Sequence, residues 1–267
     1  MTWLPDLPGY EAFLAGQYTA LPADYYERLK SSYDPRFYEQ EALGEYLNVR
    51  GGRAYYAFDR KAQQGTVPYT GHAPLWWSLD FNVNPMRSLI GQTVNERIRV
   101  LDELVLPDSN TLAACEQFLD RTDKWKTGKP LNLYIYGDAS GEHRETSASR
   151  TDWQIVKSFF SRYPDRYYAH FSVPSKNPPV KDRVNCVNAM LLNYAGKRRL
   201  VLDTRCRELA NDLEQVIWKA DPHGNVLSDL NKSDPMRTHL SDALGYYVSR
   251  EFPLRGFVGE RGGPAIL

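Results

Sequence analysis

Three aspartates of this sequence occupy positions where a carboxylate needs an explanation, and two of them end apolar runs. Asp80 follows LWWSL at 75–79, and Asp138 follows LNLYIYG at 131–137. Both runs have the composition of buried strands, where a charge is unfavourable unless it is paired or bound to a metal. Asp, Asn and Pro also form turns, so a turn-capping role for Asp80 before FNVNP is the alternative.

The third aspartate, Asp242, lies in THLSDALGYYVSR, which has the apolar spacing of a helix. Asp242 and Tyr246 are four residues apart and therefore share one stripe beside the apolar face. The apolar face consists of Leu240, Leu244, Tyr247 and Val248. An aspartate near the start of a helix also interacts favourably with the helix dipole, so a structural role for Asp242 is the alternative.

Taken together, the three carboxylates suit hard divalent cations. If the strands that end at Asp80 and Asp138 are parallel neighbours, both carboxylates project from one sheet edge, and one pKa rises unless a cation lies between them. Mg²⁺ takes oxygen ligands, and two such ions about 3.5–4 Å apart stabilise the attacking and leaving oxygens of a phosphodiester. We therefore predict that Asp80, Asp138 and Asp242 are the metal ligands and catalytic residues of a site for two Mg²⁺ or Mn²⁺ ions.

The composition of the 267 residues is that of an ordinary globular protein, with 42% apolar and 25% charged residues. Lys plus Arg and Asp plus Glu both number 33, so the net charge is zero; this weighs against a simple nucleic-acid binder but not against an enzyme with an acidic centre. Cys115, Cys186 and Cys206 form no Cys-x-x-Cys pair, which fits a reducing cytoplasm. We recognise no signal peptide and no apolar run near the roughly 20 residues that cross a membrane.

The predicted elements change character along the chain. Residues 1–50 have the features of an arm with short helical stretches, and residues 61–74 form a Gly- and Pro-rich loop. An antiparallel meander is predicted from strands at 75–80, 87–94 and 97–106. Helices at 111–124, 150–162, 180–195, 205–219 and 238–251 then alternate with strands at 131–137, 167–173 and 199–202. The fold class is therefore α/β: a mixed β-sheet flanked by helices, with an antiparallel meander first and an N-terminal helical arm.

Four segments in this order resemble parts of one known family. They are SSYDPRFYEQEALGEYLNVRGGRAYYAFDR at 31–60, SLDFNVNPM at 78–86, YIYGDASG at 134–141 and HLSDALGYYV at 239–248. The first resembles the stretch that joins the ATPase to the nuclease in the large terminase subunit of tailed bacteriophages. The other three resemble the acidic motifs of that nuclease domain, which is RNase H-like and of the RuvC type.

The resemblance implies an RNase H-like sheet and two units, an arm or linker at 1–60 and a nuclease domain at 61–267. It places the family's three metal-binding acids on Asp80, Asp138 and Asp242. One departure is the absence from this sequence of the Walker A motif G-x-x-x-x-G-K-[ST], which the terminase ATPase carries. We therefore do not expect ATP hydrolysis or DNA translocation by this chain alone.

The activity implied by the resemblance is metal-dependent endonucleolytic cleavage of double-stranded DNA during viral genome packaging. The implied partners are double-stranded DNA, the phage portal and the small terminase subunit, with no membrane, and the implied location is the host cell cytoplasm. Two alternatives stay open. One is a structure-selective RNase H-like nuclease acting on junctions or RNA–DNA hybrids, and the other is a non-catalytic DNA-packaging or portal-binding module.

Further residues are candidates around the acids. His239 and Asp234 lie close enough in sequence to Asp242 to support the second metal from outside its ligands, although Asp234 before Pro235 has the pattern of a turn residue. The polar loop GDASGEHRETSASR suits contacts with DNA phosphates, with a solvated loop as the alternative. The exposed loop VPSKNPPVKDRV follows a strand near the active-site cleft in terminase-like domains, so the resemblance implies a DNA-contacting role for it. The candidate DNA-contacting residues in them are Lys176, Lys181, Arg183, Arg144 and Arg150.

Overall fold

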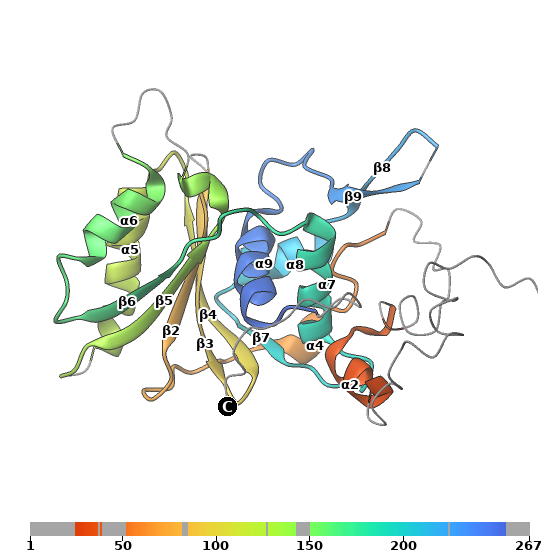
Figure 1. Ribbon diagram of the computed structural model, residues 1–267, viewed down its shortest axis with the longest axis horizontal. Coiled ribbons are helices and arrows are strands. Elements are labelled where there is room, and N and C mark those ends of the chain that lie inside the picture. The colour runs from red at the N-terminus through yellow and green to blue at the C-terminus, as the bar shows by residue number, and fades with distance from the viewer. Residues whose placement is uncertain are drawn as a thin grey trace, which may run out of the picture.

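The computed structural model describes residues 25–36, 38, 52–81, 85–126, 128–142, 150–223 and 225–254. Its main element is a seven-stranded mixed sheet with the strand order β1-β7-β4-β3-β2-β5-β6. Helices cover both faces of this sheet (Figure 1). The predicted α/β class, with a mixed sheet flanked by helices, is therefore confirmed.

The central strands form the predicted antiparallel meander, because β3 pairs antiparallel with both β2 and β4. The outer strands join in parallel: β5 to β2, β6 to β5, β7 to β4 and β1 to β7. The strands are β1 (Gln64–Gly65), β2 (Leu75–Asp80), β3 (Met86–Val94), β4 (Arg97–Leu106), β5 (Leu131–Gly137), β6 (Tyr167–Ser172) and β7 (Leu200–Asp203). A separate hairpin consists of β8 (Trp218–Ala220) and β9 (Val226–Leu230).

Three of the described helices begin at side chains that cap them, and Asp59 is the cap of α4. The side chain of Asn110 accepts a hydrogen bond from the N–H of Ala113 at the start of α5, and Thr151 and Gln154 form a capping box at the start of α6. The described helices are α2 (Tyr25–Ser32), α4 (Arg60–Gln63), α5 (Thr111–Thr122), α6 (Asp152–Phe160), α7 (Val180–Leu191), α8 (Arg207–Gln215) and α9 (His239–Glu251), with 3₁₀ turns η1 (Asp123–Trp125) and η2 (Ala139–Glu142).

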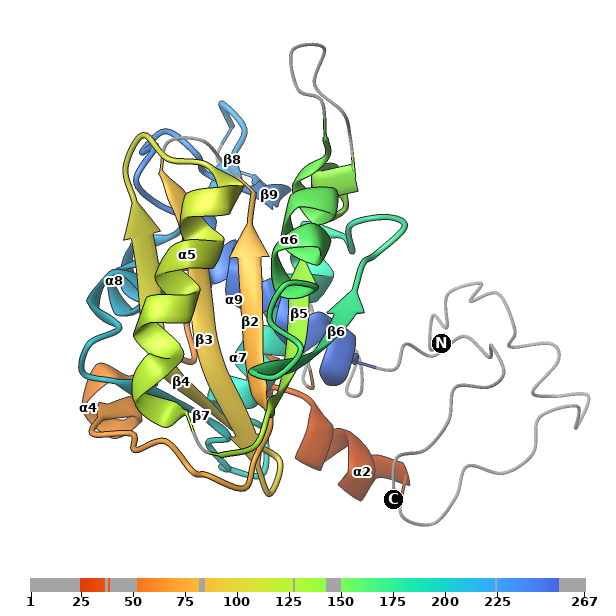
Figure 2. The ribbon, with the colours of Figure 1, turned by 90° about the vertical axis from the view of Figure 1, so that its left-hand side faces the viewer.

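Alternation along β2 divides the core into two layers. Trp77 packs with α5 and α6, and its ring lies 4.6 Å from that of Phe118. Trp76 packs on the opposite face with α7, α8 and α9, and its ring stacks on Tyr247 at 4.2 Å. Figure 2 views the sheet from the α5 and α6 side. Residues of β2 with even numbers therefore point toward α9, and this is the face to which Asp80 belongs.

Two predicted helix ends are wrong. The helix predicted at 180–195 ends at Leu191, because Leu192 has an extended backbone. The helix predicted at 205–219 ends at Gln215, and the β-branched and aromatic residues that follow lead into the strand β8.

The described part of the N-terminal arm contacts the rest of the protein. The N–H of Tyr194 donates a hydrogen bond to the carbonyl of Tyr33 at 2.7 Å. Tyr55 and Phe58 already pack in the core on the α9 side. The boundary between arm and nuclease domain after residue 60 stays a prediction, since most of residues 1–51 lie outside the described residues. Across the part of the chain that is described, every helix is too short or too polar to cross a membrane.

Candidate active site

Asp80 and Asp138 are neighbours at one edge of the sheet. Asp80 is the last residue of β2, and Asp138 directly follows β5. The two strands are parallel and in register, with Leu79 opposite Gly137, so the residues after this pair lie next to each other. Neighbouring strands are about 4.8 Å apart, and both aspartates are buried, with 4% and 7% of their surface exposed. The predicted parallel pairing of the two strands is therefore confirmed.

Both aspartates belong to the face of the sheet that α9 covers. The hydroxyl of Ser78 donates a hydrogen bond to the carbonyl of Ala243 in α9 at 2.6 Å, and Asp80 lies two residues further along the same face. Tyr136 packs in the core on that face, two residues before Asp138. The strand alternation thus directs the two carboxylates toward the first turns of α9.

Asp242 approaches the same region from α9. It lies in the first turn of the helix and is 4% exposed. The charge of Asp80 raises the pKa of Asp242 and also that of Asp138, in each case in addition to a larger effect of burial. Burial likewise raises the pKa of Tyr246, and all three carboxylates add to that increase. The three acids therefore share one electrostatic neighbourhood around Tyr246.

Asp80 contacts a histidine, and Asp138 contacts a hydroxyl group and a backbone N–H. The Nδ1 atom of His239 lies 2.8 Å from Oδ2 of Asp80, and Nε2 lies 3.0 Å from the carbonyl of Pro235. The bond to Asp80 raises the pKa of His239. Asp138 accepts hydrogen bonds from the hydroxyl of Ser140 at 2.7 Å and from the N–H of Gly141 at 3.2 Å. These contacts fix the orientation of both carboxylates. The role of His239 in supporting a second metal stays a prediction.

Asp242 is held by two cations. Its Oδ1 lies 3.1 Å from Nη2 of Arg183, and its Oδ2 lies 3.6 Å from Nζ of Lys232. The Arg183 side chain is 7% exposed and also lies over the ring of Tyr246 at 4.5 Å. Burial raises the pKa of Asp242 more than Arg183 lowers it. Arg183, predicted to contact DNA, is therefore placed inside the acidic site, where it neutralises one acid.

The donor set fits a hard divalent cation in its chemistry, because the charge of Asp80 raises the pKa of both Asp138 and Asp242, and a shared positive charge would offset this repulsion among three buried carboxylates. Among the residues that the structure describes, no three His, Cys, Asp or Glu side chains are gathered closely enough to enclose an ion. The contacts of Asp242 give the reason, since both of its oxygens face Arg183 and Lys232. The convergence of all three acids on an ion stays a prediction.

Arg87 is a buried cation that the sequence reasoning missed. It is paired with Asp80 in the register of β3 with β2 and is fully buried. Its Nη2 lies 4.0 Å from the sulfur of Met236, and its Nε and Nη1 have no hydrogen-bond partner among the described residues. The charge of Arg87 lowers the pKa of Asp212 and of His239. A permanent positive charge therefore lies beneath the acids, and an arginine inside an apolar strand was its sequence signal.

Asp212 in α8 holds the start of α9 and so positions Asp242. Its Oδ2 accepts hydrogen bonds from the N–H groups of Leu240 at 3.2 Å and Ser241 at 3.3 Å, and its Oδ1 lies 3.2 Å from Nη1 of Arg237. The N-cap residue of α9 makes no capping bond with its own side chain. Asp212 therefore satisfies N–H groups that a helix otherwise leaves unpaired. Burial raises the pKa of Asp212 to about 6 in spite of these contacts.

We expect Asp212→Asn to alter the pH dependence of folding. The pKa of Asp212 is about 6 in the folded state against an ordinary value of 3.8, so its stabilising contribution is complete below about pH 4 and is lost as the pH rises through 6. That difference corresponds to about 3 kcal/mol. The stability of the variant relative to wild type should therefore improve by about 2–3 kcal/mol between pH 4 and 7.5. Urea unfolding at both pH values measures this, and an unchanged difference would contradict it.

The remaining predicted residues occupy different places. Asp234 is exposed and shapes a turn, since its Oδ1 accepts a hydrogen bond from the N–H of Met236 at 2.8 Å. Lys181 is exposed in the first turn of α7, and Arg150 is exposed just before α6. Arg144 lies outside the described residues. None of these positions by itself establishes or removes a contact with DNA, so their roles stay predictions.

A cleft of about 210 Å³ lies beside the acids, between the end of β5, the loop after β6 and α9. Gly137 and Tyr246 line it, and these residues are next to Asp138 and one helical turn after Asp242. Lys176 is also in its wall, together with Arg250, and both are exposed. The cleft thus brings two cations to the border of the acidic site.

Comparison with solved structures identifies the fold. No protein-family model matches this chain, and no curated protein matches it by sequence. The large terminase from the thermophilic bacteriophage D6E matches with a TM-score of 0.58 and 16% identity over 86% of this chain and 53% of that one. Its complex with ATP-gamma-S gives 0.61 and 16% over 86% and 52%. The P22 large terminase nuclease domain gives 0.50 and 11% over 76% and 94%.

The sheet order and these matches show that the chain has an RNase H-like α/β fold. More specifically, it has the fold of the nuclease domain of large terminases, as the four sequence segments predicted. The chain spans about half the length of the D6E large terminase that it matches. At identities of 11–16%, the shared property is the fold.

Proposed function

We propose that this chain is a metal-dependent endonuclease that cuts double-stranded DNA by two-metal-ion hydrolysis, as the nuclease part of a large terminase in viral genome packaging. The observation that carries the proposal is that Asp80 and Asp138 directly follow the paired residues Leu79 and Gly137 at the ends of two parallel strands, with Asp242 approaching from α9. The proposed partners are DNA, a portal and a small terminase subunit in a host cytoplasm. The proposal covers cleavage only, since the sequence has no Walker A motif.

The three acids would hold the ions. When bound, Mg²⁺ or Mn²⁺ supplies Lewis-acid stabilisation of the phosphodiester and an activated water. The chain itself supplies fixed oxygen ligands: Ser140 and Gly141 orient Asp138, and His239 orients Asp80. Such supporting contacts commonly change metal affinity or activity by about 10–100-fold when they are removed.

The cleft beside the acids suits a strand of nucleic acid. Lys176 and Arg250 provide positive charge, and Ser172 and Ser249 provide hydroxyl groups in the same wall. Lysine, arginine and serine are typical ligands of backbone phosphates. We assign these residues to holding the sugar–phosphate backbone, so that the scissile bond lies over Asp138 and Asp242.

Substrate comparison tests the proposed function against the structure-selective alternatives. The full chain is incubated in Mn²⁺ with supercoiled plasmid, linear duplex, a four-way junction and an RNA–DNA hybrid of equal length. Cleavage of plasmid and linear duplex at comparable rates supports the proposal. Cleavage confined to the junction or to the hybrid assigns the site to the corresponding nuclease class instead.

A non-catalytic packaging module is the second candidate, and the ion pairs of Asp242 with Arg183 and Lys232 favour it, because they already neutralise that acid. Calorimetric titration with Mn²⁺ separates the two candidates. A nuclease site should bind Mn²⁺ with measurable heat, and that heat should disappear in Asp138→Asn. A structural module should give no heat at millimolar Mn²⁺.

We also expect Mn²⁺ to raise the melting temperature. A ligand at 100 times its Kd adds about 2.7 kcal/mol of stability, which corresponds to roughly 5–10 °C for a domain of this size. Asp138→Asn should lose most of this increase, because it removes one of the adjacent carboxylates. Asp165→Asn, a change of an exposed aspartate in the turn before β6, is the matched control and should keep all of it. Equal increases in all three proteins would contradict a site at the acids.

A further inference from the structure

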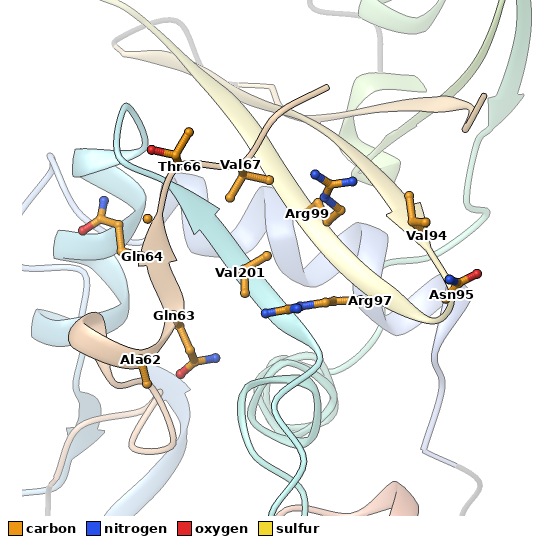
Figure 3. A pocket seen from close by; sticks show the side chains of 11 residues that line it. Ala62, Gln63, Gln64, Thr66, Val67, Val94, Asn95, Arg97, Arg99 and Val201 are labelled. Carbon is orange, nitrogen blue, oxygen red and sulfur yellow. The ribbon is translucent and has the colours of Figure 1, made fainter. Parts of the chain in front are cut away.

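A larger pocket, of about 490 Å³, lies over β7, between β1 and the start of β4 (Figure 3). Arg97 and Arg99 line it from β4, and Val67 and Val201 form an apolar part of its wall. The helices on this face stop short of it, since α5 packs against β3 and β4 and α6 packs against β6 (Figure 2). The pocket is therefore an open stretch of sheet surface at the end of the fold where β4 begins.

The pocket is separate from the acids. Val105 in β4 is paired with Arg87 in β3, which is paired with Asp80. Arg97 lies eight residues before Val105 on β4, a separation of about 26 Å at 3.3 Å per residue. A group bound in this pocket cannot be the phosphate that is cut.

The pocket carries uncompensated positive charge. No acidic residue lines it, and no ion pair joins Arg97 or Arg99 to a carboxylate within the part of the chain that the structure describes. The acids nearest in sequence and in the sheet have other partners: Glu96 lies 3.9 Å from Arg199, and Asp203 is held by Arg205 at 2.8 Å. Arginines elsewhere, such as those beside Asp102 and Asp212, are paired with acids. A pocket with two unpaired guanidinium groups selects an anion.

One of the two cations is held in place before any ligand binds. Nη2 of Arg99 donates a hydrogen bond to the carbonyl of Pro68 at 2.6 Å, and Nη1 donates to the hydroxyl of Thr70. The loop that supplies these acceptors is fixed in turn by Gln92, whose Nε2 donates to the carbonyls of Thr70 at 2.8 Å and Ala73 at 2.7 Å. The acceptors are neutral, so they orient the guanidinium without cancelling its charge. A preorganised cation loses little freedom on binding.

We propose that this pocket binds a phosphate group of the DNA backbone, at a site distinct from the three acids. Guanidinium groups match phosphate oxygens geometrically, and Asn95 and Thr66 in the wall add side chains that commonly contact phosphates. The chain has no net charge, so attraction to a polyanion must come from local patches of this kind. The inference rests on the proposed function, because a DNA-cutting enzyme has DNA as its expected anionic ligand.

The test measures binding without cleavage. The full chain is titrated onto a fluorescent 30-base-pair duplex in EDTA over a range of salt concentrations. Arg97→Ala should lower the salt-dependence slope by about one and weaken binding at every sequence, and Arg99→Ala should do the same, with Arg99→Lys restoring part of the slope. Arg162→Ala is the matched control, because Arg162 is exposed just after α6 and its guanidinium lies over the rings of Phe159 and Tyr163.

An Arg97→Ala slope equal to that of wild type overturns the proposal, and melting curves of each variant verify that it is folded. Inorganic phosphate is the second probe. Calorimetric binding of phosphate that Arg97→Ala abolishes, together with an unchanged DNA slope, would assign the pocket to a free anion and overturn the DNA contact. A chain that binds DNA through Arg97 but never cuts it overturns the proposed function and leaves this inference standing.

Discussion

Asp80→Asn is expected to abolish DNA cleavage in both Mg²⁺ and Mn²⁺. Asp80 interacts electrostatically with both of the other acids, since its charge raises the pKa of Asp138 and of Asp242. A neutral amide in its place cannot attract two dications. The loss should be at least about 1,000-fold, within the range that follows removal of one member of a catalytic unit. Plasmid nicking with each metal measures it.

The fold should survive this change. Asn can still accept the hydrogen bond that joins Asp80 to His239, and it removes a like charge beside Asp138. Thermal melts without metal should therefore give a stability within about 1 kcal/mol of wild type or above it. Asp165→Asn provides the control for removing an exposed aspartate and should nick normally. An Asp80→Asn protein that nicks plasmid near the wild-type rate would restore the reading of Asp80 as a turn cap.

Arg183→Met is expected to be the most destabilising change beside the site. It leaves Asp242 buried without its closest cation, since the two side chains are 7% and 5% exposed and 3.1 Å apart. Breaking a buried pair by removing one partner typically costs about 3–5 kcal/mol, because the remaining charge is uncompensated. Lys232 is 58% exposed at 3.6 Å and offsets only part of this cost. Denaturant unfolding at neutral pH measures the change.

Two controls distinguish the charge effect from lost packing. Arg162→Met changes an exposed arginine that contacts the ring of Phe159, and its effect should be within about 0.5 kcal/mol. The double variant Arg183→Met/Asp242→Leu removes both charges and should recover at least half of the lost stability. A single and a double variant of equal stability would show that the ion pair is not the source of the effect.

Much of the fold is readable from the sequence, because its elements are strongly patterned. The apolar run 75–79, the two strands after it and the capping residues Asn110 and Thr151 gave correct elements. The parts that were misread are short. α4 and β1 overlap the Gly- and Pro-rich stretch at 61–74, which was predicted to be a loop. The side chain of Asp59 caps α4 locally, whereas β1 depends on the distant pairing of Gln64 with Leu202.

The candidate site was predictable only in part. The sequence predicted Asp80 beside Asp138 on the condition that their strands are parallel neighbours, and the pairing of β2 with β5 meets that condition. The two cations beside Asp242 could not be predicted, because Arg183 and Lys232 reach it from separate segments of the chain. The arginine inside the apolar strand β3 was a local signal for the buried cation Arg87. The capping of α9 by Asp212 has no local signal, because it depends on how α8 packs against α9.

Anomalous diffraction from crystals soaked in Mn²⁺ tests the central claim, that the three acids form a metal-binding nuclease centre, most directly. We expect manganese peaks at the acids, with carboxylate oxygens of Asp80 and Asp138 about 2.1 Å from an ion, as small divalent cations require. Asp242 should then have turned away from Lys232 to face the metal. Crystals in saturating Mn²⁺ with no peak at the acids, and with Arg183 and Lys232 still on Asp242, would contradict the claim.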